Sequence, residues 1–310
     1  MTIVVAGGTG LAGSAIVRAY QATGAEVIAV NRSVVDLLDR DATTAFLKKT
    51  KPSLVVDAAA KVGGIGANNA FPVEFLSDNV RIQSNLMEAA HAADVEKFIF
   101  LGSSCIYPRD CAQPIKEEYL LTGPLEETNS AYAIAKIAGI ELIKSFRKEY
   151  GRTWISLMPT NLYGPNDNFE LQGSHVLPAF IRRFVEAAQN KVATETLWGT
   201  GSPKREFLHV DDLAAAVVHL GSTYDSPLHL NIGTGEDLTI KALAELVAEL
   251  AGFEGEIAWD STKPDGTPRK VLDVTKVKSL GWAPKISLRD GIASTIAWYK
   301  DASAKGVARR

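Results

Sequence analysis

Short apolar runs alternate with longer helical patterns along the first half of the chain. The runs "TIVVA", "EVIAV", "SLVVDAA", "KFIFLGS" and "TWISLMP" are rich in β-branched residues, and each lies about twenty to fifty residues from the next. Such alternation is typical of a parallel sheet whose strands are joined by right-handed helical crossovers. The pattern therefore predicts an α/β fold with a doubly wound parallel sheet, in which a ligand binds at the carboxyl ends of the strands.

The pattern changes after about residue 164. Polar loops such as "NDNFELQGS" and "STKPDGTPRK" here separate helical patterns such as "LAAAVVHL" and "IKALAELVAEL". We expect a first domain over residues 1–164 and a smaller C-terminal α/β domain over residues 165–310. Some segments of the second half, near residues 205–232, are expected to return to the first domain.

The composition narrows the class of partner. The chain has 310 residues, is 46% hydrophobic and 22% charged, and carries a net charge of −3, which gives no basic field for nucleic acid. No apolar run approaches the ~18 residues needed to span a bilayer, and "MTIVVAGGTG" begins with a strand rather than a signal peptide. Cys105 and Cys111 make no disulfide framework, and no cluster has the spacing of metal ligands. We expect a cytoplasmic protein without membrane, nucleic-acid or metal partners.

A glycine-rich loop follows the first predicted strand and opens a helical pattern. In "VVAGGTGLAG", Gly7, Gly10 and Gly13 recur every third residue, and Gly8, Gly10 and Gly13 satisfy G-x-G-x-x-G. Missing side chains let backbone N–H groups approach a pyrophosphate at the positive end of a helix, as in Rossmann-type dinucleotide sites. The alternative is a tight turn that needs glycine for backbone reasons alone.

The second predicted strand ends in "AVNRS", without the acidic residue that usually holds the ribose of NAD. Arg32 can instead pair with a 2′-phosphate, which predicts NADP(H) as the cofactor. A solvated loop arginine is the alternative.

A possible proton-transfer site lies in "SAYAIAKIAG". Tyr132 and Lys136 are four residues apart and share one face of a helix, while Ser103 ends the fourth predicted strand. A lysine ammonium and a positive nicotinamide both favour phenolate, so we expect the pKa of Tyr132 to fall from ~10 toward the working range of proton transfer. An isolated Y-x-x-x-K is more often an ordinary helix, but here it follows an N-terminal glycine loop.

Longer phrases carry a resemblance over almost the whole chain. They are "AAAKVGGIGANN", "LGSSCIYP", "YAIAKIAG", "MPTNLYGPNDNF", "REFLHVDDLA", "LNIGTGE" and "KPDGTPRKVLDVTK". With these motifs the chain resembles the extended short-chain dehydrogenase/reductase superfamily, and within it the GDP-L-fucose synthase family. The resemblance implies a bifunctional 3,5-epimerase and NADPH-dependent 4-reductase that converts GDP-4-keto-6-deoxy-D-mannose to GDP-L-fucose. It also implies a homodimer formed through two helices of each subunit, including the helix of Tyr132.

The resemblance assigns roles residue by residue. The catalytic residues would be Ser103, Cys105, Tyr132, Lys136 and His175. The cofactor would be contacted by Gly7, Gly8, Thr9, Gly10, Leu11, Ala12, Gly13, Arg32, Asp36, Leu37, Leu101, Gly102, Ser103, Ser104, Lys136, Pro159, Thr160, Asn161, Leu162 and His175. The GDP-sugar would be bound by Arg183, Trp198, Arg205 and Asp265. From the residues alone, Arg183 is equally a solvated helix residue and Trp198 a core residue.

Inversion at C3 and C5 needs a base on one face of the sugar ring and an acid on the other. A thiol with a free pKa of ~8.5 is a suitable base, although a cysteine after a strand is often only a small buried hydrophobe. A histidine suits the acid. Two of the five histidines lie in helical runs and one enters a strand, whereas His175 and His209 both sit at element boundaries. Spacing does not choose between these two; the resemblance implies His175, with His209 as a structural link to "VDD".

Three other functions stay open. A nucleotide-sugar 4-epimerase or a 4,6-dehydratase would recycle bound NAD, but dehydratases usually carry an acidic pair beside the serine, where this chain has Ser104 and Cys105. A catalytically silent NADPH-binding sensor or scaffold commonly loses the tyrosine or the lysine, and both are present here.

Overall fold

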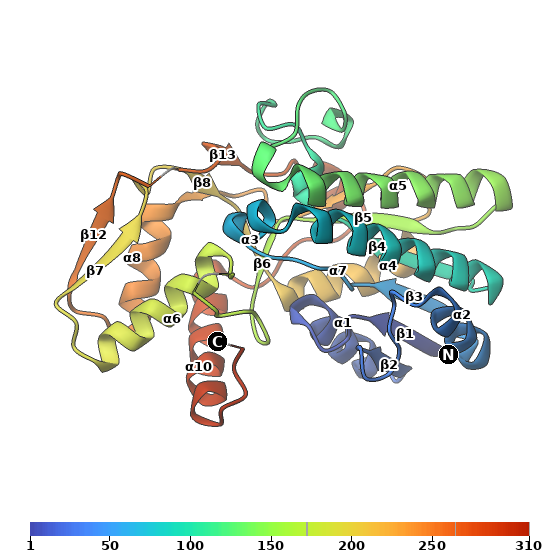
Figure 1. Cartoon of the computed structure of the whole chain (residues 1–310), viewed down its shortest axis with the longest axis horizontal. Helices are drawn as coiled ribbons and strands as arrows, with labels where there is room; N and C mark the ends of the chain where they lie inside the picture. The colour runs from blue at the N-terminus through green and yellow to red at the C-terminus, as the bar shows by residue number, and fades with distance from the viewer. Residues whose placement is uncertain (172, 264, 310) are drawn as a thin grey trace.

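A six-stranded parallel sheet forms the centre of the first part of the chain. The computed structural model describes residues 1–171, 173–263 and 265–309, and it places the strands in the order β10-β5-β4-β3-β1-β2 (Figure 1). The strands are β1 (Thr2–Ala6), β2 (Glu26–Val30), β3 (Leu54–Asp57), β4 (Lys97–Leu101), β5 (Ile155–Pro159) and β10 (Leu230–Ile232). The predicted α/β fold with a doubly wound parallel sheet is confirmed.

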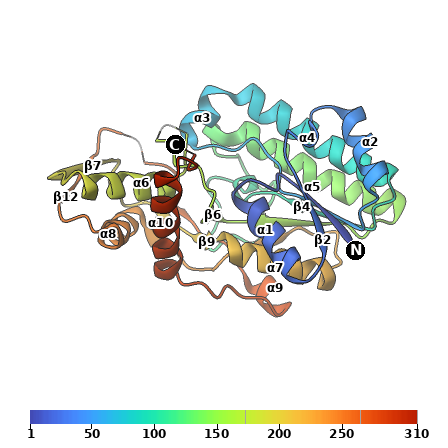
Figure 2. The ribbon, with the colours of Figure 1, turned by 90° about the horizontal axis from the view of Figure 1, so that it is seen from below.

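Helices cover both faces of this sheet. On one face, α1 (Leu11–Ala22) packs beside α7 (Val210–Thr223). On the other, α4 (Pro72–Ala92) lies between α2 (Arg40–Thr50) and α5 (Ser130–Tyr150), with the short α3 (Ile65–Ala70) before it. Figures 1 and 2 show the two layers on opposite sides of the strands. Because the chain leaves β1 for β2 on one side and returns to β3 on the other, the carboxyl ends of β1 and β3 form the crevice of a doubly wound sheet.

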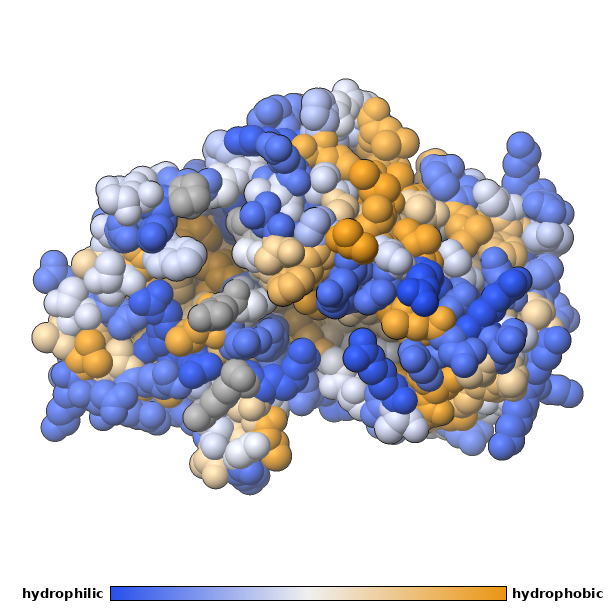
Figure 3. Space-filling view, in the orientation of Figure 1, coloured by the Kyte–Doolittle hydropathy of each residue, from blue (hydrophilic) through white to orange (hydrophobic). Residues whose placement is uncertain are grey.

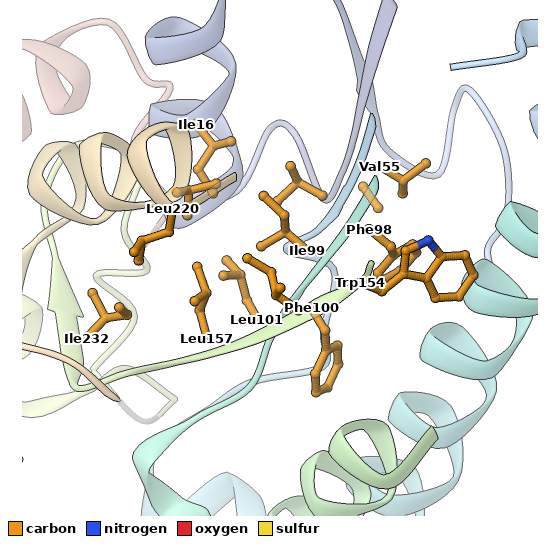
Figure 4. Close-up of a cluster of buried hydrophobic side chains, with 14 of the residues drawn as sticks. Ile16, Val55, Phe98, Ile99, Phe100, Leu101, Trp154, Leu157, Leu220 and Ile232 are labelled. Atoms are coloured by element: carbon orange, nitrogen blue, oxygen red, sulfur yellow. The ribbon is translucent and has the colours of Figure 1, made fainter. Parts of the chain in front are cut away.

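Side chains of the central strands point alternately to the two helical layers. Ile99 of β4 faces α7, where a Cβ added to Gly221 would lie 3.2 Å from the Ile99 Cδ1 atom. The next residue, Phe100, faces α5, where a Cβ on Gly139 would meet its ring. Both side chains are fully buried (Figure 4). Burial on both faces explains why these strands are continuous apolar runs rather than alternating ones.

A second hydrophobic core lies in a separate lobe, on the left in Figures 1 and 2. Helices α6 (Val176–Gln189), α8 (Ile240–Ala251) and α10 (Leu288–Ala304) pack there beside the parallel pair β7 (Thr194–Trp198) and β12 (Glu256–Asp260). Phe184 and Leu243 are among its fully buried residues. The helical patterns predicted for the second half are confirmed as α7 and α8.

Short elements connect the two cores. Strand β6 (Asn161–Tyr163) pairs with β9 (Phe207–His209), and β8 (Lys204–Arg205) lies between β11 (Leu238–Thr239) and β13 (Arg269–Lys270). Three 3₁₀ turns follow β4, namely η1 (Ser104–Ile106), η2 (Glu117–Tyr119) and η3 (Glu127–Asn129), and α9 (Thr275–Ser279) packs on β10.

Later segments contribute to the first core. Leu208, Leu213 and Leu230 belong to it, and so do Leu272 and Val277, which lie beyond the return segments expected from the sequence. We keep the division at residue 164, with returns near 205–232, as a proposal that the two cores support. Across the described residues, no helix combines the length and the apolar character needed to cross a membrane.

Candidate active site

The glycine loop between β1 and α1 is shaped by close backbone packing. Gly7 has φ +72°, and a Cβ there would lie 2.7 Å from the carbonyl oxygen of Ala58; a Cβ on Gly13 would overlap the carbonyl oxygen of Gly7. Gly10 is the N-cap of α1, and within the described residues no side chain caps it and no acidic residue lies in the first turn. The amides of this turn and the positive end of the helix are therefore available to an anion, which fits the pyrophosphate of a dinucleotide.

Apart from Lys136 on α5 and His175 before α6, the other predicted cofactor residues gather at the same edge of the sheet. They follow three further strands: Arg32, Asp36 and Leu37 after β2; Leu101, Gly102, Ser103 and Ser104 at the end of β4; and Pro159, Thr160, Asn161 and Leu162 at the end of β5. The carboxyl ends of parallel strands share one edge, so the fold brings the four groups together. Arg32 is exposed there. Their contacts with a cofactor stay a prediction.

Ser103, Tyr132 and Lys136 meet where β4 and α5 approach. The hydroxyl of Ser103 hydrogen-bonds the phenol of Tyr132 and also accepts the backbone N–H of Cys105 at 3.2 Å. Lys136 donates from Nζ to the carbonyl oxygen of Leu101 at 3.0 Å. Its Nζ lies 5.9 Å from the centre of the Tyr132 ring. The three side chains predicted as a proton-transfer set are thus adjacent.

The expected fall in the pKa of Tyr132 does not occur in the protein alone. Burial raises the pKa of this phenol above its ordinary value near 10, and the charges of Cys105 and Asp57 act in the same direction, while the hydrogen bond with Ser103 opposes them. Desolvation, which the sequence argument did not weigh, is the largest cause, and the fall expected with a bound nicotinamide stays a prediction. The consequence is a phenol that holds its proton.

Asp57 is a member of the site that the sequence analysis missed. It ends β3, is fully buried, and accepts the N–H of Ala59 through Oδ1 at 3.1 Å; Oδ2 has no partner among the described residues. Burial raises its pKa to about 6, against the opposing effects of the Lys136 charge and the Ala59 amide. Burial lowers the pKa of Lys136, and Asp57 opposes that effect. The sequence signal that could have identified Asp57 is an acidic residue at the end of a buried apolar strand.

The sulfur of Cys105 lies among polar groups. Lys270 Nζ is 3.5 Å from Sγ and Asn129 Nδ2 is 3.9 Å from it. Cys105 is partly exposed and lines a pocket together with Ser104, Asn129 and Lys270. It is therefore not a small hydrophobe in the core. Lys270 and Asn129 were not identified from the sequence, because Lys270 is distant in the chain and Asn129 belongs to no motif.

His175 and His209 occupy different environments. His175 precedes α6 with an exposed side chain, yet the surrounding protein desolvates the imidazole and lowers its pKa, and Lys270 adds to that effect. His209 is buried; its Nδ1 accepts the backbone N–H of Asp211 at 3.2 Å and so caps α7. That contact is the structural link to "VDD" expected for His209.

The predicted substrate residues lie on the second lobe around the end of β7. Arg183 donates to the carboxylate of Glu195 at 2.5 Å and to the carbonyl oxygen of Thr196 at 2.6 Å, so it is not a solvated helix residue. Trp198 is 72% exposed, which excludes a place in the core. Figure 3 shows the surface hollowed between this lobe and the first part of the chain.

Asp265 and Arg205 connect this region with Cys105. Asp265 accepts the N–H of Thr200 at 3.0 Å and its hydroxyl at 2.7 Å. Arg205 donates to the carbonyl oxygen of Thr267 at 2.5 Å and is near enough to both Asp265 and Cys105 for their charges to interact. Arg205 and Asp265 are thus near one another, Arg183 contacts Thr196 close to Trp198, and the binding of a ligand by these four residues stays a prediction.

A doubly wound sheet with an uncapped glycine turn and an adjacent serine, tyrosine and lysine defines an enzyme that acts with a nicotinamide dinucleotide. The profile of the NAD dependent epimerase/dehydratase family matches residues 3–233. The chain belongs to that family, and within it to the GDP-L-fucose synthases, as its relatives show. It is 54% identical to GDP-L-fucose synthase 1 of Arabidopsis thaliana, over 96% of this chain and 92% of that protein.

Two further comparisons agree. The chain is 49% identical to the GDP-L-fucose synthase of Escherichia coli (strain K12), over 96% of each chain. It superposes with a TM-score of 0.90 and 29% identity on the crystal structure of a GDP-L-fucose synthetase from Naegleria fowleri bound to NADP, covering 100% of this chain and 96% of that one. The predicted membership of an epimerase/reductase family is therefore confirmed.

Proposed function

We propose that this protein converts GDP-4-keto-6-deoxy-D-mannose to GDP-L-fucose, by epimerisation at C3 and C5 and NADPH-dependent reduction at C4. The observation that carries the proposal is the position of Cys105, whose charge is near enough to act on the phenol of Tyr132. A group able to move a carbon-bound proton and a group able to protonate a carbonyl oxygen thus share one site. The names of the full-length relatives support the same reaction.

The epimerisation uses the ketone at C4, which acidifies the protons on C3 and C5 because the carbanion is an enolate. Cys105 takes such a proton on one face of the ring, and His175 supplies one on the other. Both groups approach Lys270, Cys105 through its sulfur at 3.5 Å and His175 through its charge interaction. Lys270 is thus a common neighbour of the two groups to which we assign the proton transfers.

The reduction needs a proton on the C4 oxygen. NADPH, when bound, supplies the hydride. Tyr132 donates the proton: because burial raises its pKa, the phenol stays protonated until negative charge develops on the oxygen. Ser103 hydrogen-bonds that phenol and orients the C4 oxygen of the sugar beside it. The ammonium of Lys136, which donates to the Leu101 carbonyl, places a positive charge near the phenol.

The cofactor is held by the residues at the carboxyl edge of the sheet. The amides of the first turn of α1 receive the pyrophosphate, and the exposed Arg32 after β2 pairs with the 2′-phosphate. The GDP moiety extends over the second lobe. There Arg205 and Arg183 face its diphosphate, the exposed ring of Trp198 meets the nucleoside, and Asp265 receives hydrogen bonds from it.

We also propose a cytoplasmic homodimer. Helices α4 and α5 pack side by side, and both carry exposed apolar side chains: Val73 is 76% exposed, Leu76 36% and Ile134 49%. Figure 3 shows apolar surface over the region of these helices. The two free cysteines fit a reducing compartment.

The proposal is tested by product analysis. Purified protein with GDP-4-keto-6-deoxy-D-mannose should consume one NADPH for each sugar and give GDP-L-fucose, identified by chromatography and NMR. A UDP-4-keto sugar is the control and should be reduced poorly. Interconversion of 4-epimers without net NADPH consumption would instead establish a 4-epimerase, and loss of water from the sugar would establish a dehydratase.

A further inference from the structure

Asn129 is the N-cap residue of α5, but its side chain does not cap the helix. Asparagine is favoured at this position because its side-chain oxygen accepts an N–H of the first turn, yet among the described residues no such hydrogen bond forms. The amide Nδ2 instead lies 3.9 Å from Sγ of Cys105, and Asn129 lines the same pocket as Cys105 and Lys270. The side chain is thus turned from its own helix toward the candidate active site.

The carbonyl oxygen of this amide is left without a partner. Oδ1 of Asn129 is buried and has no hydrogen-bond partner in the described part of the chain. The backbone N–H of the same residue is bound separately, by the carboxylate of Glu126 at 3.1 Å. Nearly all buried acceptors in folded proteins are paired, so an unpaired one beside a pocket indicates a donor that a ligand supplies.

The other side chains that line this pocket do not offer the same group. Its cations can only donate hydrogen bonds. The side-chain oxygen of Gln113 accepts the N–H of Val271 at 3.0 Å, and the carboxylate of Glu126 accepts the hydroxyl of Thr128 at 2.6 Å. Of the described residues around the pocket, Asn129 alone has a buried side-chain oxygen without a partner.

The place of the amide in the site identifies the ligand group. Ser103 connects the two groups of the proposed reaction, since its hydroxyl bonds the phenol of Tyr132 and accepts the N–H of Cys105 at 3.2 Å. In that reaction Tyr132 meets the C4 oxygen and Cys105 meets a carbon next to C4. A group beside the sulfur therefore faces the substituent of C3 or of C5. C5 carries a methyl group, which donates no hydrogen bond, whereas C3 carries a hydroxyl group.

We propose that Asn129 is a specificity-determining residue whose Oδ1 accepts a hydrogen bond from the hydroxyl group on C3 of the keto sugar. The inference rests on the proposed function and deepens it, because the pocket that takes a proton from the sugar then also selects sugars with oxygen on C3. A neutral amide suits this place, since it binds the hydroxyl without adding negative charge beside a ring on which an enolate forms. A sugar without this hydroxyl leaves Oδ1 unpaired, which weakens its binding.

The test compares GDP-4-keto-6-deoxy-D-mannose with its 3-deoxy analogue, and both reactions are followed by NADPH oxidation. The measured quantity is the ratio of kcat/KM for the hydroxylated sugar to kcat/KM for the analogue, in which general losses of activity cancel. We expect this ratio to fall about tenfold or more in Asn129→Leu and to be retained in Asn129→Asp, which keeps an oxygen acceptor. Thr128→Val, which removes a neighbouring hydroxyl bonded to Glu126, is the matched control and should leave the ratio unchanged.

The unfolding free energy without ligands separates this role from a structural one. Because Oδ1 has no partner among the described residues, Asn129→Leu should be as stable as the parent protein. A less stable Asn129→Leu whose ratio is unchanged would show that the residue is structural. If this variant does not fold, inhibition of the parent protein by GDP-L-fucose and by its 3-deoxy analogue is compared, and equal inhibition constants would overturn the proposal.

Failure of the proposed function gives a different result. A parent protein that makes no GDP-L-fucose from the keto sugar would refute that function and this inference with it. A parent protein that makes GDP-L-fucose, but whose ratio is unchanged in Asn129→Leu, would refute the role of Asn129 alone.

Discussion

Asp57 and Lys136 are two fully buried groups of opposite charge at the carboxyl edge of the sheet, and each opposes the effect of burial on the other. Asp57 ends β3 and Lys136 lies on α5, with Phe100 of β4 in register with Asp57 and its ring 4.8 Å from Lys136 Nζ. The charge of Lys136, which lies beside Tyr132, therefore depends on whether Asp57 is protonated.

This relationship predicts a pH-dependent stability. The pKa of Asp57 is raised from its usual value of 3.8 to about 6, so the folded protein binds this proton more tightly than the unfolded chain. The stabilising contribution is complete below pH 4 and is lost as the pH rises through 6, by an amount on the order of 2–3 kcal/mol. Urea unfolding at pH 4.5 and 7.5 measures it. Asp57→Asn lacks this contribution, so its unfolding free energy at pH 7.5 minus that at pH 4.5 should exceed the same difference in the parent protein by about that amount. An identical pH dependence in the two proteins would contradict the assignment.

Arg32 is predicted to select the cofactor. Arg32→Ala removes the cation that pairs with the 2′-phosphate, so the Kd for NADPH should rise about tenfold or more while the Kd for NADH stays constant. Fluorescence titration measures both constants. Lys48→Ala, an exposed cation on the last turn of α2, is the control and should leave both unchanged. An equal rise in the Kd for NADPH and for NADH in Arg32→Ala would show that Arg32 does not bind the 2′-phosphate.

Gly13 is predicted to hold the shape of the glycine loop. In Gly13→Ala the added methyl group meets the carbonyl oxygen of Gly7, so the loop must shift. We expect a loss of about 1–3 kcal/mol in unfolding free energy together with weaker NADPH binding. In Gly10→Ala the nearest atom is the Gly7 oxygen at 3.3 Å, and the loss of stability should be smaller. The opposite order in chemical denaturation would show that the loop is not packed in this way.

The proposed dimer predicts that charge on α5 will separate the subunits. Ile134 is 49% exposed on this helix, and Ile134→Lys would place a charge in an apolar interface, which is costly when the charge has no partner. Light scattering should then report a monomer where the parent protein is a dimer. Leu121→Lys, at a 65% exposed residue outside both helices, should remain dimeric. A dimer that persists in Ile134→Lys would place the interface elsewhere.

The sequence predicted those helices and strands that show a clear pattern of apolar residues along the chain. The run "TIVVA" became β1 because its residues from Ile3 to Ala6 are apolar and buried on both faces of the strand. The sequence could not predict β8 and β13, because strands of two residues are too short to show a pattern of apolar positions. Their place depends on contacts between distant segments, such as the hydrogen bond from the Leu272 N–H to the Glu206 carboxylate.

The same limit applies to the site. Tyr132 and Lys136 were found because four residues on a helix place them on one face. Lys270 was missed because the fold alone brings it to Cys105. The rise in the pKa of Tyr132 in the protein alone could not be predicted, because its largest cause is burial, which a sequence does not report.

The most direct test of the central claim follows substrate protons in heavy water. The parent protein, Cys105→Ser and Tyr132→Phe are incubated with GDP-4-keto-6-deoxy-D-mannose and NADPH, and deuterium at C3 and C5 is measured by NMR beside NADPH oxidation. The parent should give GDP-L-fucose deuterated at both carbons. Tyr132→Phe should still exchange protons while reduction falls about 10²-fold or more, and Cys105→Ser should lose the exchange. Normal exchange and product in Cys105→Ser, or a parent protein that neither exchanges protons nor oxidises NADPH, would contradict the account.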